Sequence, residues 1–128
     1  MREKGGLWFG WSGDLNADPA PQPEVVTRER IDYATIDLTQ TQYDRYYRGF
    51  CNTTLWPLFH YLTDRFRYDH EWHAGYRDVN RWFAERLVPL LRPDDRLWIH
   101  DYHLIPLARE LRSLGVTQRI GLFLHIPF

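Results

Sequence analysis

The hydrophobic pattern of residues 96–128 predicts one strand–helix–strand unit. Residues 97–99 form a short apolar run directly after the turn-forming residues 93–95, which indicates a strand. Residues 104–114 then carry apolar side chains at helical spacing, and a second apolar run follows at 120–124. Parallel strands joined by a crossover helix have this pattern, and we expect both strands to be buried on both faces.

Polar residues gather where these two strands end. They are His100, Asp101, Tyr102 and His103 after the first strand, and His125 after the second. Parallel α/β sheets bind ligands outside the carboxyl ends of their strands, so we expect the functional site at this edge.

The first third of the chain predicts two more strands. Residues 5–13 form an apolar run punctuated by glycines, and residues 31–38 alternate imperfectly, as in a strand near a sheet edge. Trp8 and Trp11 could both be core residues, but alternation places them on opposite faces, which would allow one of them to line a cleft. Residues 14–24 contain three prolines and predict an exposed loop without a function.

A helix is predicted to begin at Thr39, because residues 39–42 have the capping-box pattern with glutamine at the third helical position. An aromatic stripe follows at helical spacing: Tyr43, Tyr46, Tyr47 and Phe50. Such a stripe is usually core. Adjacent tyrosines cannot both point inward, however, so one phenol at the edge of the stripe is free to bind a ligand.

Further along, Pro57 should stop or restart this helix and leave Trp56 exposed at a bend. Residues 62–72 are charged and aromatic and are predicted to form a loop. Apolar residues at helical spacing between positions 76 and 87 predict another helix that ends near Pro89.

Composition excludes several classes of protein. A chain of 128 residues with 44% hydrophobic residues forms at most one domain but can bury a core. The net charge of −1 and the scattered basic residues argue against a nucleic-acid partner. The single cysteine, Cys51, allows no internal disulfide and fits a reducing compartment. No apolar stretch could span a membrane, so we expect a cytoplasmic protein without a membrane partner.

Four blocks of this sequence closely resemble, in the same order, blocks of the trehalose-6-phosphate synthase family. The blocks are GGLWFGWSG, YYRGFCNTTLWPLFHY, WIHDYHLIPLARELR and RIGLFLHIPF, and together they leave out only about residues 14–30. The resemblance implies an α/β fold: a Rossmann-like parallel sheet with flanking helices. This sheet would be part of the N-terminal domain of a two-domain (GT-B) retaining glycosyltransferase.

The resemblance also implies an activity, in which glucose is transferred from UDP-glucose to glucose 6-phosphate to give trehalose 6-phosphate. The expected partners are therefore these two small molecules. No metal and no cofactor are expected apart from the nucleotide-sugar co-substrate. Whether a full-length member forms a homo-oligomer is left open.

Site residues follow from the resemblance block by block. Tyr47 and Asp101 match positions that bind the acceptor sugar phosphate, and Trp56 matches a position that shapes the acceptor pocket. Trp11 is expected to line the same cleft. His125 matches the catalytic histidine near the donor glucose.

Two features of the family pattern are not found in this sequence. The family begins with a strand that carries a phosphate-binding arginine, followed by a glycine-pair loop, whereas Gly5 and Gly6 belong to the later GGLWFGWSG block. The family also has a second, donor-binding domain. We therefore expect residues 1–128 to be a partial N-terminal, acceptor-side domain that does not transfer glucose by itself.

Two alternatives remain open from the residues. His100, His103 and His125, together with Asp101, could hold a zinc ion, which would be retained through dialysis. The chain could also be a non-catalytic fragment that binds or senses a sugar phosphate. Individual residues have structural explanations as well, since the two loop histidines could satisfy backbone groups and Asp101 could favour a helix N-terminus.

Overall fold

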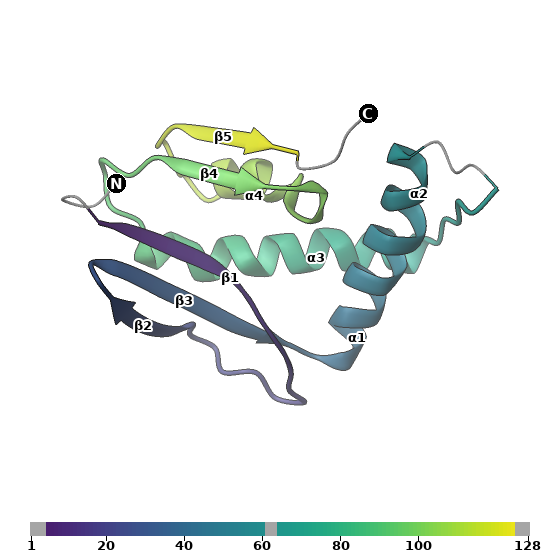
Figure 1. The fold of residues 1–128 in the computed structure, drawn as a ribbon, viewed down its shortest axis with the longest axis horizontal. Coiled ribbons are helices and arrows are strands. Elements are labelled where there is room, and N and C mark those ends of the chain that lie inside the picture. The colour runs from purple at the N-terminus through teal and green to yellow at the C-terminus, as the bar shows by residue number, and fades with distance from the viewer. Residues whose placement is uncertain (1–4, 61–63, 125–128) are drawn as a thin grey trace.

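The computed structural model describes residues 5–60 and 64–124, in which the strands form two sheets. β1 (Gly6–Leu15), β3 (Ile31–Leu38) and β2 (Glu24–Arg28) form one sheet in the order β1-β3-β2, and β4 (Leu97–His100) pairs with β5 (Ile120–Phe123) in the other. The pairs β1–β3 and β4–β5 are parallel. In Figure 1, these four strands all point the same way. The prediction of an α/β fold with parallel strands is confirmed.

The strand β2 has no counterpart in the sequence prediction. It pairs antiparallel with β3 through a two-residue turn at Glu29 and Arg30, whose φ angles of 50° and 72° are both positive. Tight hairpin turns of this type favour asparagine and glycine, so the turn has no recognisable signal here. β3 is the middle strand of this sheet and lies beside the edge strand β2, so the prediction that residues 31–38 lie near a sheet edge is confirmed.

One long helical segment follows β3. It consists of α1 (Gln40–Gln42), the π-helix η1 (Tyr43–Leu55) and α2 (Trp56–Phe59). The capping box is confirmed, since the Thr39 hydroxyl accepts from the Gln42 amide and the Gln42 side chain accepts from the Thr39 amide. The proline at the second position of α2 restarts the helix, because a missing N–H costs nothing in a first turn.

The helix α3 (His70–Leu87) begins earlier than the sequence indicates. The Asp69 side chain accepts a hydrogen bond from the Glu71 amide and caps the helix, so residues 70–72 of the predicted loop are helical. A 3₁₀ turn, η2 (Val88–Leu90), follows α3 at the expected proline.

A short helical connection joins β4 to β5. The 3₁₀ turn η3 (Tyr102–Leu104) follows β4 directly, and α4 (Leu107–Ser113) comes next. Gly115 has a φ of 88° just after α4, the left-handed conformation with which helices commonly end. The predicted strand–helix–strand unit is therefore confirmed.

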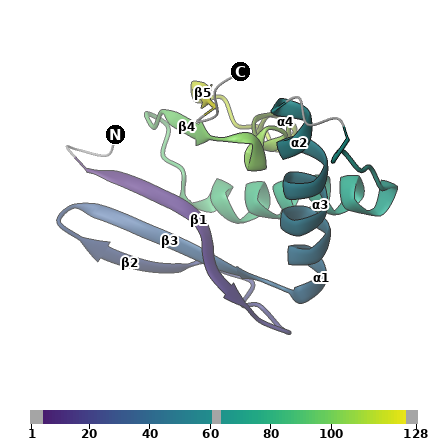
Figure 2. The ribbon, with the colours of Figure 1, turned by 45° about the vertical axis from the view of Figure 1, so that its right-hand side comes forward.

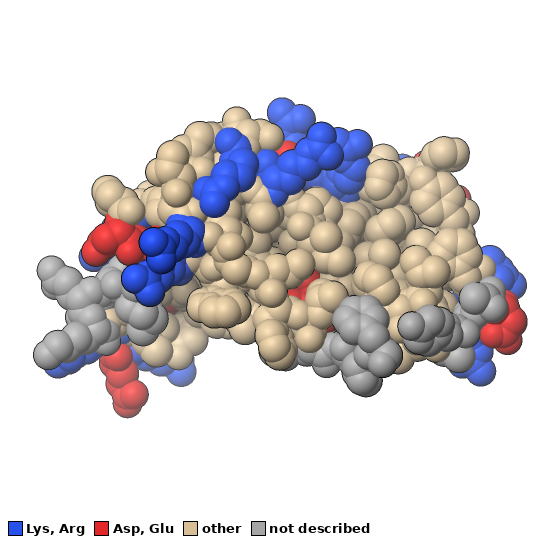
Figure 3. Space-filling model, turned by 90° about the horizontal axis from the view of Figure 1, so that it is seen from above, with Lys and Arg blue, Asp and Glu red and all other residues tan. Residues whose placement is uncertain are grey.

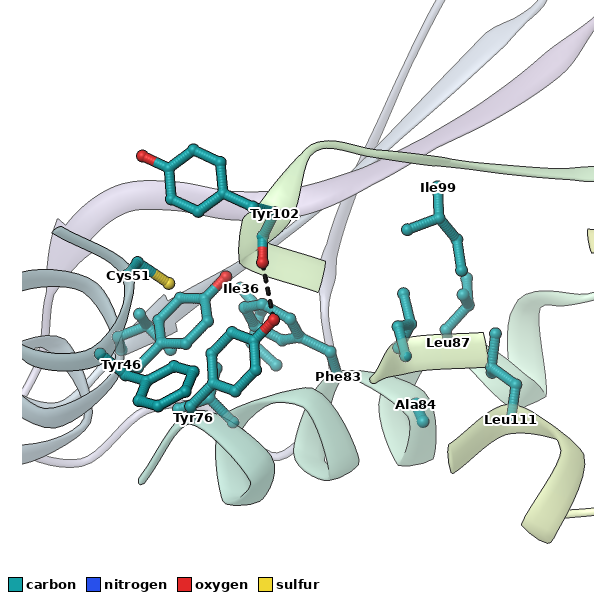
Figure 4. Packing of buried hydrophobic residues seen from close by; sticks show 14 of the residues in the cluster. Ile36, Tyr46, Cys51, Tyr76, Phe83, Ala84, Leu87, Ile99, Tyr102 and Leu111 are labelled. Atoms are coloured by element: carbon teal, nitrogen blue, oxygen red, sulfur yellow. Dashed lines mark hydrogen bonds between the residues drawn. The ribbon is translucent and has the colours of Figure 1, made fainter. Parts of the chain in front are cut away.

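The helix α3 is the centre of the packing. It contacts η1 and α4, runs below β4 and β5, and lies beside the three-stranded sheet (Figures 1 and 2). The segment from α1 to α2 stands across the ends to which β1, β3 and β4 point (Figure 2). Buried core side chains come from β3, η1, α3, β4 and α4, and several are drawn in Figure 4.

The expectation that β4 and β5 are buried on both faces is wrong for the described residues. Ile99 is buried, but Trp98 is 69% exposed and Phe123 is 52% exposed. Seen from above, the molecule shows mainly uncharged atoms with a row of basic side chains along one side (Figure 3). Among the described residues, none of the helices is long and apolar enough to cross a membrane.

Candidate acceptor site

A cavity of about 550 Å³ opens between β1, η1 and β4. Its lining includes Trp11 from β1, Tyr47 from η1, and His100 and His103 from the end of β4 and the turn that follows it. The lining extends along β1 from Gly6 and from Asp95 along β4, and three segments that are far apart in sequence meet where it reaches the carboxyl end of β4. This is the edge at which the sequence predicts the functional site.

Trp11 reaches the cavity because β1 alternates. Leu7, Phe9 and Trp11 pack toward the core, whereas Trp8 lies on the opposite face and is 50% exposed. The pairing of β1 with β3 shifts register after Trp11, where Gly13 adopts a φ of 91°. The bulge lets the Trp11 indole N–H donate to the backbone oxygen of Asp14 over 2.9 Å, which orients the ring.

Tyr46 and Tyr47 differ in burial, as the sequence predicts for adjacent tyrosines of the aromatic stripe. Tyr46 is buried, and burial raises the pKa of that phenol well above its ordinary value. Tyr47 is half-buried and stacks on Tyr43, with ring centroids 5.5 Å apart, and its ring lies 5.6 Å from Trp11. The two predicted site residues Trp11 and Tyr47 are therefore in contact, with the tyrosine at the edge of the core.

Asp101 is one of three non-glycine residues with a positive φ in the described part of the chain. Its φ of 74° and ψ of 174° lie in a region that glycine alone adopts readily, and a non-glycine residue there costs about 1–3 kcal/mol. The Asp101 amide donates to the Phe123 oxygen over 2.7 Å, and its carboxylate Oδ1 accepts from the Tyr102 amide over 2.9 Å. None of the described groups donates to Oδ2, so one oxygen is available to a ligand.

His103 connects the Asp101 turn to Tyr47. Its ring stacks on Tyr47 with centroids 5.1 Å apart and on Tyr102 at 4.2 Å. Burial lowers the pKa of His103 below its ordinary value of 6.5, against a smaller opposing effect of the Asp101 charge. The Nε2 atom is enclosed and has no hydrogen-bond partner among the described residues. A neutral imidazole thus lies between two phenol rings.

Trp56 does not line the cavity. It is 41% exposed, as the sequence predicts, and its ring lies 6.0 Å from that of Tyr102, the residue after Asp101. Its other neighbour is His60, whose ring centroid is 3.8 Å away. The predicted catalytic residue His125 lies outside the described residues.

The side chains around Asp101 are kept in their neutral forms. Burial, together with the Asp101 charge, raises the pKa of the Cys51 thiol beyond its ordinary range. Burial also raises the pKa of Tyr102 to about 12, with smaller contributions from the nearby Cys51 and Asp101. Such a site is suited to hydrogen bonding and ring stacking.

A zinc site has no support in the part of the chain that the structure describes. There, no three histidine, cysteine, aspartate or glutamate side chains lie close enough to hold a metal ion together. The third histidine of that alternative is His125, which is not described.

Two residues near this site were missed by the sequence analysis. Tyr76 and Asn80 of α3 donate to the backbone of the turn after Asp101. Asn80 could have been noticed, because it is a polar residue one turn after Tyr76 on the apolar face of a predicted helix.

The fold and the site together define an α/β protein with polar side chains gathered at the carboxyl end of a parallel strand, the edge at which such sheets bind ligands. The whole chain, residues 1–128, matches the sequence profile of glycosyltransferase family 20. This chain belongs to that family, as the sequence blocks predict.

Relatives of known name agree with this assignment. A trehalose-6-phosphate synthase of Cronobacter sakazakii is 51% identical over 128 residues, which are 100% of this chain and 27% of that protein. The crystal structure of a UDP-forming α,α-trehalose-phosphate synthase from Burkholderia xenovorans superimposes with a TM-score of 0.95 and 55% identity, covering 98% of this chain and 28% of the other. A complex of the Burkholderia xenovorans synthase with glucose-6-phosphate gives a TM-score of 0.92 at 55% identity, over 100% and 28% of the two chains. The chain thus spans about a quarter of the length of these relatives.

Proposed function

We propose that this chain is the acceptor-side, Rossmann-like part of a UDP-forming trehalose-phosphate synthase. The reaction transfers glucose from UDP-glucose to glucose 6-phosphate and gives trehalose 6-phosphate. The names of relatives that are 51% and 55% identical over nearly the whole chain support this reaction, and one of these relatives is complexed with glucose-6-phosphate.

The geometry of Asp101 carries the proposal. A strained residue persists only where the surrounding structure holds it, and such residues cluster at ligand sites. The carboxylate stands at the end of β4 with Oδ2 available, and a carboxylate accepts hydrogen bonds from sugar hydroxyls. Asp101 therefore binds the acceptor sugar.

The aromatic residues have complementary roles. The Tyr47 phenol lies at the edge of the core beside the cavity and donates a hydrogen bond to the acceptor phosphate. Trp11 orients Tyr47 and lines the cleft, and the exposed ring of Trp56 offers a flat apolar surface to a pyranose. His125 keeps the catalytic role near the donor glucose that the resemblance implies.

A hybrid enzyme tests this function. The 128 residues replace the matching segment of the Cronobacter sakazakii relative, and trehalose 6-phosphate formation is measured. We expect an active hybrid in which Asp101→Ala raises the KM for glucose 6-phosphate about ten- to a hundredfold, since a hydrogen bond to a charged group contributes about 1.5–3 kcal/mol. The KM for UDP-glucose should be unchanged.

Asp18→Ala is the matched control, because Asp18 is an exposed carboxylate in the loop before β2. It should leave both KM values unchanged. An inactive hybrid beside an active parent enzyme would refute the proposed reaction. An active hybrid that is indifferent to Asp101→Ala would refute the acceptor site.

A further inference from the structure

Two side chains of α3 hold the turn that follows Asp101. The Tyr76 hydroxyl donates to the backbone oxygen of Tyr102 over 2.6 Å, a bond drawn as a dashed line in Figure 4. The Asn80 side-chain amide donates to the backbone oxygen of His103 over 3.2 Å. The donors lie one helical turn apart, and the acceptors are consecutive carbonyl groups, so α3 is hydrogen-bonded to the turn at two adjacent residues.

Both donors are themselves fixed. Asn80 is fully buried, and its amide also donates to the Tyr76 backbone oxygen over 2.9 Å. Tyr76 is buried as well and stacks on Tyr46. Burial, followed by the nearby Cys51, raises the pKa of the Tyr76 phenol, against a smaller effect of a backbone hydrogen bond from Ile105, so the hydroxyl keeps its proton.

Asn80 is a costly residue at its position. Its Oδ1 atom is buried and finds no hydrogen-bond partner among the described residues, which destabilises the folded state. Leucine has a similar size and would avoid that penalty, although it would lose the two hydrogen bonds that the Asn80 amide donates. Stability alone therefore does not explain an asparagine here, whereas its donor group has a definite use at the His103 carbonyl.

We propose that Tyr76 and Asn80 are positioning residues of the acceptor site, which hold the turn after β4 so that Asp101 keeps its left-handed backbone. This inference rests on the proposed function. Neither side chain lines the cavity, and both act through the Asp101 turn. Without the two hydrogen bonds, the turn relaxes to a negative φ at Asp101, and the carboxylate leaves the position in which it meets the acceptor sugar.

The test compares Tyr76→Phe and Asn80→Leu in the hybrid enzyme. Each variant should raise the KM for glucose 6-phosphate about five- to tenfold, as expected for the loss of one hydrogen bond, with the KM for UDP-glucose unchanged. Asn80→Leu should change the thermal unfolding temperature little, because relief of the unpaired Oδ1 offsets the lost hydrogen bonds. Loss of affinity without loss of stability separates positioning from a merely structural role.

Thr54→Val and Tyr33→Phe are the controls. The Thr54 hydroxyl donates to the backbone oxygen of Arg67, so the valine variant loses a buried side chain–backbone hydrogen bond to a different loop. It should lower stability and leave the acceptor KM unchanged. Tyr33→Phe removes a partly exposed phenol from the outer face of β3 and should change neither quantity.

A second readout does not depend on activity. In the 128-residue chain, the amide–Hα coupling constant and carbon shifts of Asp101, measured by NMR, should indicate a positive φ that is lost in Asn80→Leu. If Asp101→Ala impairs acceptor use but Tyr76→Phe and Asn80→Leu do not, and φ stays positive, the positioning role is refuted and the proposed function stands. If Asp101→Ala also has no effect on acceptor use, the proposed acceptor site is itself refuted.

Discussion

The backbone strain at Asp101 can be measured by comparing Asp101→Gly with Asp101→Ala in the 128-residue chain. Both variants lose the carboxylate and its hydrogen bond from the Tyr102 amide, so those losses cancel in the comparison. The variants differ in the β-carbon alone. At a φ of 74° and a ψ of 174°, alanine retains the steric conflict and glycine does not.

The magnitude follows from two opposing effects. Relief of the strain favours glycine by about 1–3 kcal/mol. Glycine also gives the unfolded chain more conformational entropy, which favours alanine by about 0.4–1 kcal/mol. We therefore expect the free energy of unfolding of Asp101→Gly to exceed that of Asp101→Ala by about 0.5–2 kcal/mol.

Urea unfolding followed by tryptophan fluorescence measures this difference. At the exposed helical position Arg77 of α3, the order should reverse, with the glycine variant less stable than the alanine variant by about 1 kcal/mol. The sign of the difference in free energy of unfolding between the glycine and alanine variants therefore shows whether the backbone at a position is strained. An Asp101→Gly variant that is no more stable than Asp101→Ala would show that this backbone conformation carries no strain.

Three other predictions concern the same core. Burial lowers the pKa of His103 below 6.5, so the unfolded state binds the proton more readily and the free energy of unfolding should fall as the pH decreases from about 6.5 through the folded-state pKa. Urea titrations at several pH values should show a smaller fall in His103→Phe, and an equal pH dependence in both proteins would contradict this. Burial raises the pKa of Cys51, so a thiol reagent should label the native chain far more slowly than the urea-unfolded chain, and equal labelling rates would place this thiol at the surface. In Gly49→Ala the new β-carbon would lie 2.6 Å from Cγ of Trp72, so the free energy of unfolding should decrease by about 1–3 kcal/mol. An unchanged urea midpoint would show that the tryptophan moves without cost.

Local signals in the sequence were sufficient for much of the fold. The alternation at 31–38 matches β3, and the apolar runs at 97–99 and 120–124 match most of β4 and β5. The capping box at Thr39 forms as predicted. Each of these signals depends on residues that are near one another in sequence, and the physical cause is the burial of one face or the pairing of a terminal amide.

The same reasoning placed the candidate site at one edge of the sheet but did not give its geometry. Polar residues after two parallel strands identified the end of β4, and the adjacent-tyrosine argument correctly left one phenol at the edge of the core. The meeting of Trp11, Tyr47 and His103 depends on how β1, η1 and β4 pack together, which no single segment determines. The resemblance to a family named Trp11 and Tyr47 as site residues, and the structure brings Tyr47 into contact with both Trp11 and His103.

The tertiary structure alone decided the features without a local signal. The turn at Glu29 and Arg30 has positive φ angles at residues that do not favour them, so pairing with β3 imposes the hairpin. The left-handed backbone of Asp101 is likewise held by distant partners, the Phe123 carbonyl on β5 and the α3 donors of the turn. A chain segment adopts an unfavourable conformation only when contacts from elsewhere in the fold outweigh its local cost, and such contacts cannot be read from neighbouring residues.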